Sequence, residues 1–371
     1  MNKKYFTKKA IFAELAVLLI LVLCLTLSKT NANIIPTFSP QKNYIKWVDF
    51  TVSYHALDLA YTYDVESYGE EVHINWIELL AYCAAKTGGQ FSNSTSTQMS
   101  KVVEELKNKD ATMDSLTENL KYYSYYLEAY NAVLGGLVGE YEVETYSETE
   151  PGHKIWVEKY GLKGFSPIAK GYYYNDYDDF GVSRSYGFKR QHLGHDLMGS
   201  TGTPIIAVES GYVEAMGWNQ YGGWRLGIRS FDKKRYYYYA HLRKDLPYNT
   251  SLTIGSVVSA GDVIGYLGRT GYSNKENTNN IDTSHLHFGI QLIFNESQKE
   301  GNNEIWIDCY ALTKFLCKNK SETAQMENSK EYTRVYNMKD PAVTSYQEHL
   351  AKKKNRFLFR LWDFLKKDEI S

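Results

Sequence analysis

Three short stretches of this 371-residue chain carry histidine and aspartate side chains at spacings that suit metal chemistry. They read RQHLGHDLMG (residues 190–199), RYYYYAHL (235–242) and TSHLHFGIQL (283–292). The six candidate residues are His192, His195, Asp196, His241, His285 and His287. A catalytic zinc site takes three protein ligands and leaves one position for water. The six residues must therefore divide into ligands, catalytic groups and bystanders.

His285 and His287 lie two residues apart in a run that is typical of a β-strand. Side chains at positions i and i+2 of a strand point to the same face of the sheet. Both imidazoles are therefore expected on one face, where two histidines and one carboxylate would suit zinc. Strand geometry does not distinguish the two, so either or both could be ligands beside His192 and Asp196.

The segment around His192 is expected to be extended or looped, because Gly194 and Gly199 argue against a helix. Even spacing keeps His192 and Asp196 on one side of an extended chain and turns His195 to the other side. We therefore interpret His195 as a histidine at the surface or one that supports a ligand, and not as a ligand itself.

His241 ends the run RYYYYAHL, which is predicted to be a strand from its aromatic residues. Strand alternation places its side chain on the same face as those of Tyr237 and Tyr239. A histidine that ends a strand near a loop can be catalytic, but a lone one is more often structural. Its role therefore depends on the groups that the fold brings near it.

Five motifs between residues 165 and 317 occur in an order that is known from one peptidase family. They read RQHLGHD, GTPIIAVESGYV, YAHL, VSAGDVIGYLGRTG and SHLHF. The set resembles the lysostaphin-type (LytM-like) zinc metalloendopeptidases of bacterial cell walls. In the same region, short apolar runs are broken by glycine about every eight to twelve residues, which independently indicates an antiparallel all-β domain.

The resemblance implies a role for five of the six candidates. Carried over by motif, His192, Asp196 and His287 are the ligands of one zinc ion per chain. His241 and His285 are implied to be the catalytic groups. Because all five positions are filled, the sequence favours an active enzyme over a relative that has lost its activity.

The implied reaction is hydrolysis of peptide bonds in peptidoglycan stem peptides or cross-bridges by water that zinc activates. Two alternatives stay open: a catalytically silent module that binds the wall or a protein partner, and a zinc carboxypeptidase that removes terminal D-alanine. A long insert at residues 272–283 is expected beside the cleft. The formal net charge of −1 gives no electrostatic reason to expect nucleic acid as a partner.

Residues 1–33 are predicted to anchor the chain in a bacterial cytoplasmic membrane. Four lysines among the first nine residues precede an apolar stretch from residue 10 to residue 27, interrupted only by Glu14. This length is close to the roughly 20 residues that cross a bilayer, and the lysines predict a cytoplasmic N-terminus. The rest of the chain is then predicted to lie outside the membrane, after a single pass.

Residues 44–139 are predicted to form a small helical domain. Apolar residues from Trp76 to Ala84 recur at helical spacing, which predicts one amphipathic helix. A second helix is predicted from Leu116 to Leu134, where Ser115 and Glu118 fit a capping box at its start.

Residues 140–164 contain acidic residues, proline and glycine, and are predicted to be a linker to the β-domain at residues 165–317. Residues 318–371 are predicted to be a polar linker followed by a basic amphipathic helix. The chain is thus predicted to be a multidomain α and β protein, with a transmembrane helix, a small helical domain, an antiparallel all-β metallopeptidase domain and a C-terminal amphipathic helix.

Overall fold

The structure, a computed structural model, describes residues 44–185, 189–299 and 301–368. The predicted membrane anchor at residues 1–33 lies outside these ranges. Within them, no helix combines the length and the apolar character that are needed to cross a membrane.

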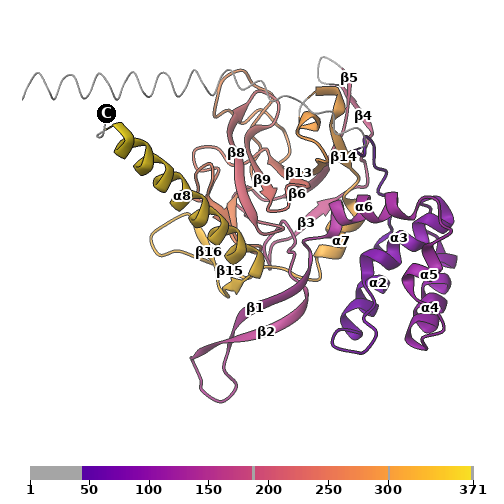
Figure 1. The fold of residues 1–371 in the computed structure, drawn as a ribbon. Coiled ribbons are helices and arrows are strands. Elements are labelled where there is room, and N and C mark those ends of the chain that lie inside the picture. Colours follow the sequence, from indigo (N-terminus) through magenta and orange to yellow (C-terminus); the bar gives the residue numbers. More distant parts are fainter. Residues whose placement is uncertain (1–43, 186–188, 300, 369–371) are drawn as a thin grey trace, which may run out of the picture. The chain divides into compact units, whose positions relative to one another are not determined.

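Helices make up the N-terminal part of the described chain, as predicted (Figure 1). Their bounds are α2 Tyr54–Glu66, α3 Trp76–Thr87, α4 Asn93–Lys107, α5 Met113–Thr117 and α6 Tyr123–Leu134. The predicted helix that starts at Trp76 is confirmed. α3 begins where the side chain of Asn75 accepts hydrogen bonds from two backbone N–H groups, and it ends at Gly88, whose φ of 66° is left-handed.

The single helix predicted over residues 116–134 is wrong, because two helices, α5 and α6, occupy this region. The capping box that opens α5 is formed by Thr112 and Ser115, one turn before the predicted pair of Ser115 and Glu118. Backbone hydrogen bonds between residues three apart lead the chain through residues 118–122. Such turns nearly preserve helical spacing, which is why the apolar pattern continues across the break.

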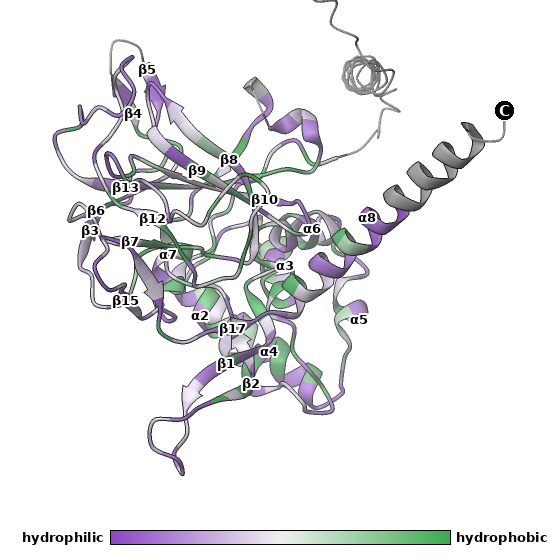
Figure 2. Ribbon diagram, turned by 90° about the vertical axis from the view of Figure 1, so that its left-hand side faces the viewer, coloured by the Kyte–Doolittle hydropathy of each residue, from purple (hydrophilic) through white to green (hydrophobic). Residues whose placement is uncertain are grey.

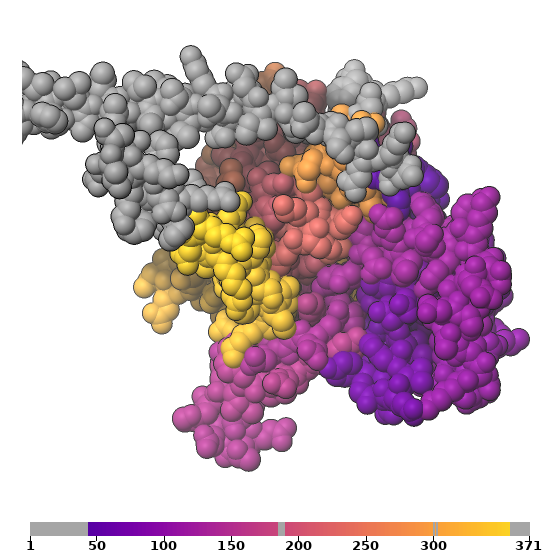
Figure 3. Space-filling model, in the orientation of Figure 1, coloured from indigo at the N-terminus to yellow at the C-terminus, as the bar shows by residue number. Residues whose placement is uncertain are grey.

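A β-hairpin occupies the segment that was predicted to be a linker at residues 140–164. Its strands, β1 (Val138–Tyr146) and β2 (Lys154–Leu162), pair antiparallel, and β17 (Met338–Lys339) pairs with the other edge of β1. Pro151 and Gly152 of this segment lie in the hairpin turn. Figures 1 and 3 show the hairpin standing out from the neighbouring elements.

The predicted antiparallel β-domain is present, and among the described residues it is built on an eight-stranded sheet. The strands follow the order β11-β8-β9-β10-β13-β6-β3, and β14 also pairs with β13. Their bounds are β3 Tyr174–Asp176, β6 His195–Gly199, β8 Gly211–Asn219, β9 Gly223–Ser230, β10 Arg235–Ala240, β11 Val257–Val258, β13 His285–Leu292 and β14 Ile305–Ile307. The three strands that carry or precede the site histidines, β10, β13 and β6, are therefore neighbours.

The described chain also contains short ladders, two α-helices and two 3-10 helices at Glu296–Gln298 and Gly301–Asn303. The ladders are β4 Ser183–Ser185 with β5 Lys189–Gln191, β7 Pro204–Ile206 with β12 Val263–Tyr266, and β15 Thr323–Gln325 with β16 Tyr332–Arg334, and the α-helices are α7 Tyr310–Leu316 and α8 Pro341–Asp368. α8 confirms the predicted C-terminal helix, and its lysines at 352–354 are exposed. The side chains from residue 357 onward lie outside the description, so the predicted apolar stripe of this helix stays a prediction.

The helical region and the sheet share one hydrophobic core, to which α3, α6 and β13 contribute Leu80, Tyr130 and Phe288. Figure 2 shows hydrophobic residues in green along these elements. At the junction, Arg235 of β10 is only 1% exposed and pairs with Glu209. It also donates hydrogen bonds to the backbone carbonyls of Asn131 and Ala132 in the last turn of α6. The predicted boundary near residue 140 therefore does not separate two cores.

Candidate active site

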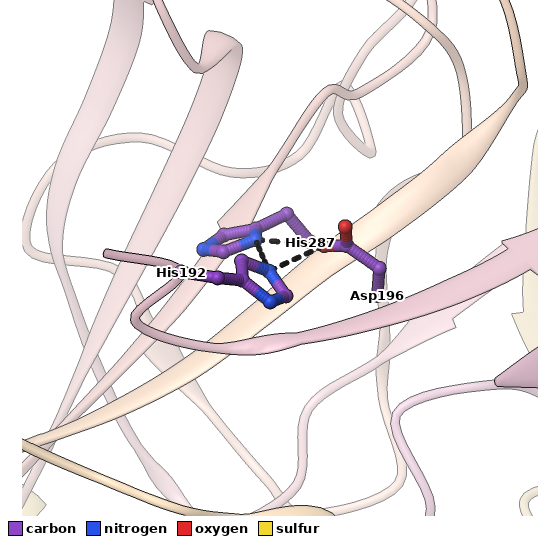
Figure 4. Close-up of side chains that lie close together, drawn as sticks. All are labelled: His192, Asp196 and His287. Atoms are coloured by element: carbon purple, nitrogen blue, oxygen red, sulfur yellow. Dashed lines mark hydrogen bonds and ion pairs between the residues drawn. The ribbon is translucent and has the colours of Figure 1, made fainter. Parts of the chain in front are cut away.

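Three of the predicted site residues converge on one face of the central sheet. β6 and β13 pair so that Asp196 lies directly opposite His287, which puts both side chains on the same face. His192 reaches this point from the loop before β6 (Figure 4). Oδ1 of Asp196 lies 3.1 Å from Nε2 of His192 and 2.8 Å from Nδ1 of His287. The two nitrogens are 3.1 Å apart.

Gly194 allows the two histidines of this group to approach each other. A Cβ atom on Gly194 would lie 2.6 Å from Cε1 of His287, which is closer than side chains pack. Glycine is therefore the residue that fits here. The prediction that residues 192–196 are extended or looped is confirmed, since β6 begins at His195 and no helix precedes it in the described loop.

The donor atoms fit a zinc ion. The candidate ligand atoms of His192, Asp196 and His287 all lie within 4.8 Å of one another. Two imidazole nitrogens and one carboxylate oxygen are a donor set that zinc accepts in catalytic sites. The group therefore has the chemistry and the proximity that one metal ion requires.

Asp179 and Arg184 hold two of these ligands in place. Oδ1 of Asp179 accepts a hydrogen bond from Nδ1 of His192 at 2.9 Å, so the lone pair of Nε2 is left for the ligand group. Arg184 donates to Oδ2 of Asp196 at 2.7 Å and also forms an ion pair with Asp179. One continuous network thus orients His192 and Asp196.

The electrostatics of the group favour the protonation states that bind metal. Burial alone would raise the pKa of Asp196, but its close contacts with His192 and His287 outweigh burial and hold this pKa well below its usual range. Burial lowers the pKa of His287, although Asp196 opposes the shift. At neutral pH Asp196 is therefore a carboxylate and His287 is neutral.

The two predicted catalytic histidines lie beside the ligand group. The ring centroids of His241 and His285 are 4.7 Å apart, and those of His241 and His287 are 5.9 Å apart. Nε2 of His285 lies 3.8 Å from Oδ2 of Asp196. Among the described residues, the convergent ligand group contains His287 and not His285. The structure thus distinguishes the two histidines that strand geometry left equivalent.

Backbone carbonyls determine the tautomer of both flanking histidines. Nδ1 of His241 donates to the carbonyl oxygen of Thr270 at 3.0 Å, and Nδ1 of His285 donates to that of Thr283 at 2.8 Å. A carbonyl can only accept, so Nδ1 carries the proton and Nε2 is left for chemistry. Burial, assisted by the nearby histidines, lowers the pKa of His241 well below its usual value. His241 is therefore neutral at neutral pH.

The face on which His241 lies differs from the prediction. Alternation placed it with Tyr237 and Tyr239, but β10 ends at Ala240 and His241 has a left-handed φ of 62°. Ala240 is opposite His287 in the ladder, so the two tyrosines point to the other, buried face. The reversal of the backbone at His241 returns its imidazole to the face of the ligands.

His195 lies on the face of β6 opposite the ligands, as its spacing predicted. It is buried, opposite Phe288 in the ladder, and its Nε2 is 3.2 Å from Asp176. Burial lowers the pKa of His195 to about 4. Its ring packs against Tyr310, with centroids 5.1 Å apart. The structure therefore directs His195 into the protein interior and not to the surface.

Sequence reasoning missed four residues around the site, namely Asp179, Arg184, Arg190 and Tyr272. The ring of Tyr272 stacks with that of His241 at 6.0 Å, so the insert at residues 272–283 begins beside the site, as predicted. The guanidinium of Arg190 lies 5.3 Å from the centre of the Tyr272 ring. These residues lie in loops or in strands of only three residues. Such segments are too short to show a periodic pattern from which the residues could be predicted.

Comparison with known proteins identifies the family of this region. The model of Peptidase family M23 matches residues 190–301. The L-Ala--D-Glu endopeptidase of Bacillus subtilis (strain 168) is 36% identical over 124 residues, which cover 33% of this chain and 36% of that protein. The glycyl-glycine endopeptidase ALE-1 of Staphylococcus capitis is 33% identical over 120 residues, which cover 32% of this chain and 28% of that protein.

A solved structure is also similar to part of this chain. The catalytic domain of lysostaphin from Staphylococcus simulans is 30% identical and has a TM-score of 0.30, and the match covers 38% of this chain and 92% of that domain. The chain spans 20% to 36% of the length of the curated relatives that it matches. The matched region contains the three convergent candidate ligands and both flanking histidines. Residues 190–301 are thus a Peptidase M23 domain.

Proposed function

We propose that this protein is a zinc-dependent endopeptidase that hydrolyses peptide bonds in peptidoglycan. The observation that carries the proposal is the convergence of His192, Asp196 and His287, with the Nε2 atoms of two further histidines left for chemistry beside them. The relatives support the same reaction, since they are named as endopeptidases. Their names give two candidate bonds, one between L-Ala and D-Glu and one between glycines.

The residues of this chain suggest a division of work. A zinc ion held by His192, Asp196 and His287 would supply Lewis acidity, polarising the scissile carbonyl and lowering the pKa of water to about 7. His241 is neutral with a free lone pair on Nε2, so it is suited to accept a proton from the attacking water. His285 keeps its Nε2 free beside the ligand group, so it is suited to exchange a proton with the oxyanion or the leaving amine.

We further propose that residues 1–33 anchor the enzyme in the cytoplasmic membrane of a bacterium, with the peptidase domain on the outer side. The support is the cluster of lysines ahead of an apolar stretch of sufficient length. Such an anchor would keep the active site close to peptidoglycan. Labelling from outside intact cells should then modify exposed lysines of the peptidase domain, whereas equal protection of all lysines would contradict this orientation.

The test of the reaction is digestion of isolated peptidoglycan by the purified chain, followed by mass spectrometry of the fragments. We expect about one zinc per chain and new amine termini at opened stem peptides or cross-bridges. His285→Ala should lower the rate by roughly 100- to 10,000-fold and still bind zinc, because it removes a proton-transfer group and no ligand. His287→Ala should lose both zinc and activity, and replacement of the exposed His153 by alanine should change neither.

Two other outcomes would assign a different function. Release of single D-alanine residues without opened cross-links would indicate a carboxypeptidase. Intact walls of several chemical types after incubation with zinc-loaded protein would indicate a binding module without catalysis.

A further inference from the structure

Two arginines face the active site from one short ladder. Arg184 of β4 lies directly opposite Arg190 of β5, and directly opposed residues point to the same face of a ladder. Arg184 reaches Asp196 on the site side. Arg190 is therefore directed toward the same side, two residues before the ligand His192.

Aromatic rings connect Arg190 to a catalytic histidine. The guanidinium of Arg190 lies 5.3 Å from the centre of the Tyr272 ring, contacts its hydroxyl, and is half-buried. The same ring stacks with His241 at 6.0 Å. The charge of Arg190 is thus connected to His241 through one aromatic ring.

Arg190 is also within electrostatic reach of the other wall of the site. Tyr238 lies edge-on to His287, with ring centroids 5.9 Å apart. Burial raises the pKa of Tyr238, whereas the charges of Arg225 and Arg190 oppose the rise. The charge of Arg190 therefore lies beside Tyr272 on the His241 side and also acts on Tyr238, which lines the His287 side.

We propose that Arg190 binds a carboxylate on the residue next to the scissile bond, and that it directs the enzyme to acidic stem peptides. The inference rests on the proposed endopeptidase function and adds its substrate class. A guanidinium presents a planar fork of N–H donors that matches a carboxylate, and stacking on an aromatic ring holds this fork in a fixed orientation. A D-Glu residue supplies such a carboxylate, whereas its amidated form and glycine do not.

Three synthetic peptides test the inference on the purified full chain. They are a stem peptide with L-Ala linked to D-Glu whose α-carboxylate is free, the same peptide with that carboxylate amidated, and pentaglycine. We expect kcat/KM to be roughly 10- to 100-fold higher for the free carboxylate than for the amide, as one lost charged hydrogen bond predicts. Arg190→Gln should abolish this preference, mainly through a higher KM for the acidic peptide.

Controls separate recognition from general damage. Arg190→Lys keeps the charge without the planar fork and should retain only part of the preference. Arg356→Gln removes an exposed arginine of α8 and should retain all of it. Because Tyr272 positions Arg190, Tyr272→Phe should preserve the preference and Tyr272→Leu should weaken it. Circular dichroism and zinc content report whether each variant is folded.

The outcomes distinguish this inference from the function on which it rests. Equal cleavage of the acidic and amidated peptides by the wild-type chain overturns the role of Arg190 alone. So does a preference for pentaglycine, or a preference for the acidic peptide that survives in Arg190→Gln. Failure to cleave any of the three peptides or intact peptidoglycan overturns the endopeptidase function, and the role of Arg190 with it.

Discussion

Asp179 and Arg184 supply no ligand atom, but they hold two of the candidate ligands in position. Asp179 accepts the Nδ1 proton of His192, and Arg184 joins Asp179 to the free oxygen of Asp196. A carboxylate behind a histidine ligand fixes its tautomer and the orientation of its ring. The metal affinity of the site should therefore depend on the loop residue Asp179, although Asp179 is not one of the three candidate ligands that converge in the described part of the chain.

Asp179→Asn is expected to lower the affinity for zinc roughly 10- to 100-fold, because an amide is a weaker acceptor for the Nδ1 proton of His192. Competition with a chelator of known affinity measures the change. The neighbouring Asp178 is exposed, so Asp178→Asn is the matched control and should bind zinc like the wild type. Equal affinity of both variants would contradict the role of Asp179.

His195 should make the metal-free protein sensitive to acid. Its pKa is about 4 in the folded chain and about 6.5 when unfolded, so between these values the unfolded state binds more protons. Stability is therefore lost as pH falls from about 6.5 to about 4. Denaturant titrations in EDTA should show that the free energy of unfolding of His195→Gln falls less steeply than that of the wild type over this pH window. The exposed His153 is the control, and a slope that His195→Gln does not change would argue against this account.

At the scale of elements, register and backbone reversal assemble the site. The pairing of β6 with β13 puts Asp196 opposite His287, and a slip of one residue would turn one of these side chains into the core. The end of β10 makes a second contribution, because the left-handed backbone of His241 returns its ring to the site face. The functional groups thus depend on where strands end as much as on their alternation.

Within the helical region, α3 packs against α2, α4 and α6, and its start depends on Asn75. Asn75→Ala removes the acceptor for two backbone N–H groups and should lower the free energy of unfolding by about 1 kcal/mol. Chemical denaturation measures the loss. Asn93 is the matched control, since it is exposed and follows the capping residue of α4. Peptidase activity of both folded variants should stay at the wild-type level.

At the scale of the whole molecule, the helical region and the peptidase sheet behave as one structure. Their common core and the contacts of Arg235 with Glu209 and the end of α6 join them. Gly136 belongs to this junction, because a Cβ atom there would overlap the Glu209 carboxylate. The described residues from 45 onward should therefore unfold in a single cooperative transition, which thermal unfolding monitored in parallel by helix and tryptophan signals can check.

Arg235→Met should destabilise this unit by about 3 to 5 kcal/mol, because it leaves the Glu209 carboxylate buried without its partner. Adding Glu209→Leu should recover part of the loss, since the uncompensated charge is removed as well. Denaturant unfolding of the single and double variants gives the comparison. If the double variant loses as much unfolding free energy as the two single variants together, the unpaired charge is not the cause of the destabilisation.

The sequence by itself determined the parts of this protein that local patterns encode. Glycine-spaced apolar runs predicted the antiparallel β-domain, and helical spacing predicted α3 and α8. The motif residues His192, Asp196 and His287 were named from spacing and resemblance, and the structure brings them together. The spacing also predicted that His195 points to the opposite face of the strand, as the structure shows. Each of these features depends on side-chain periodicity within one element or on residues close in sequence.

Only the tertiary structure decided the rest. The face of His241, the hairpin at residues 138–162, the network of Asp179 and Arg184, and the core shared by helices and sheet were not predicted. Each depends on contacts between residues that are distant in sequence or on a backbone reversal that alternation does not encode. Periodicity predicts which side of an element is buried, but the packing of the whole chain determines which residues that side contacts.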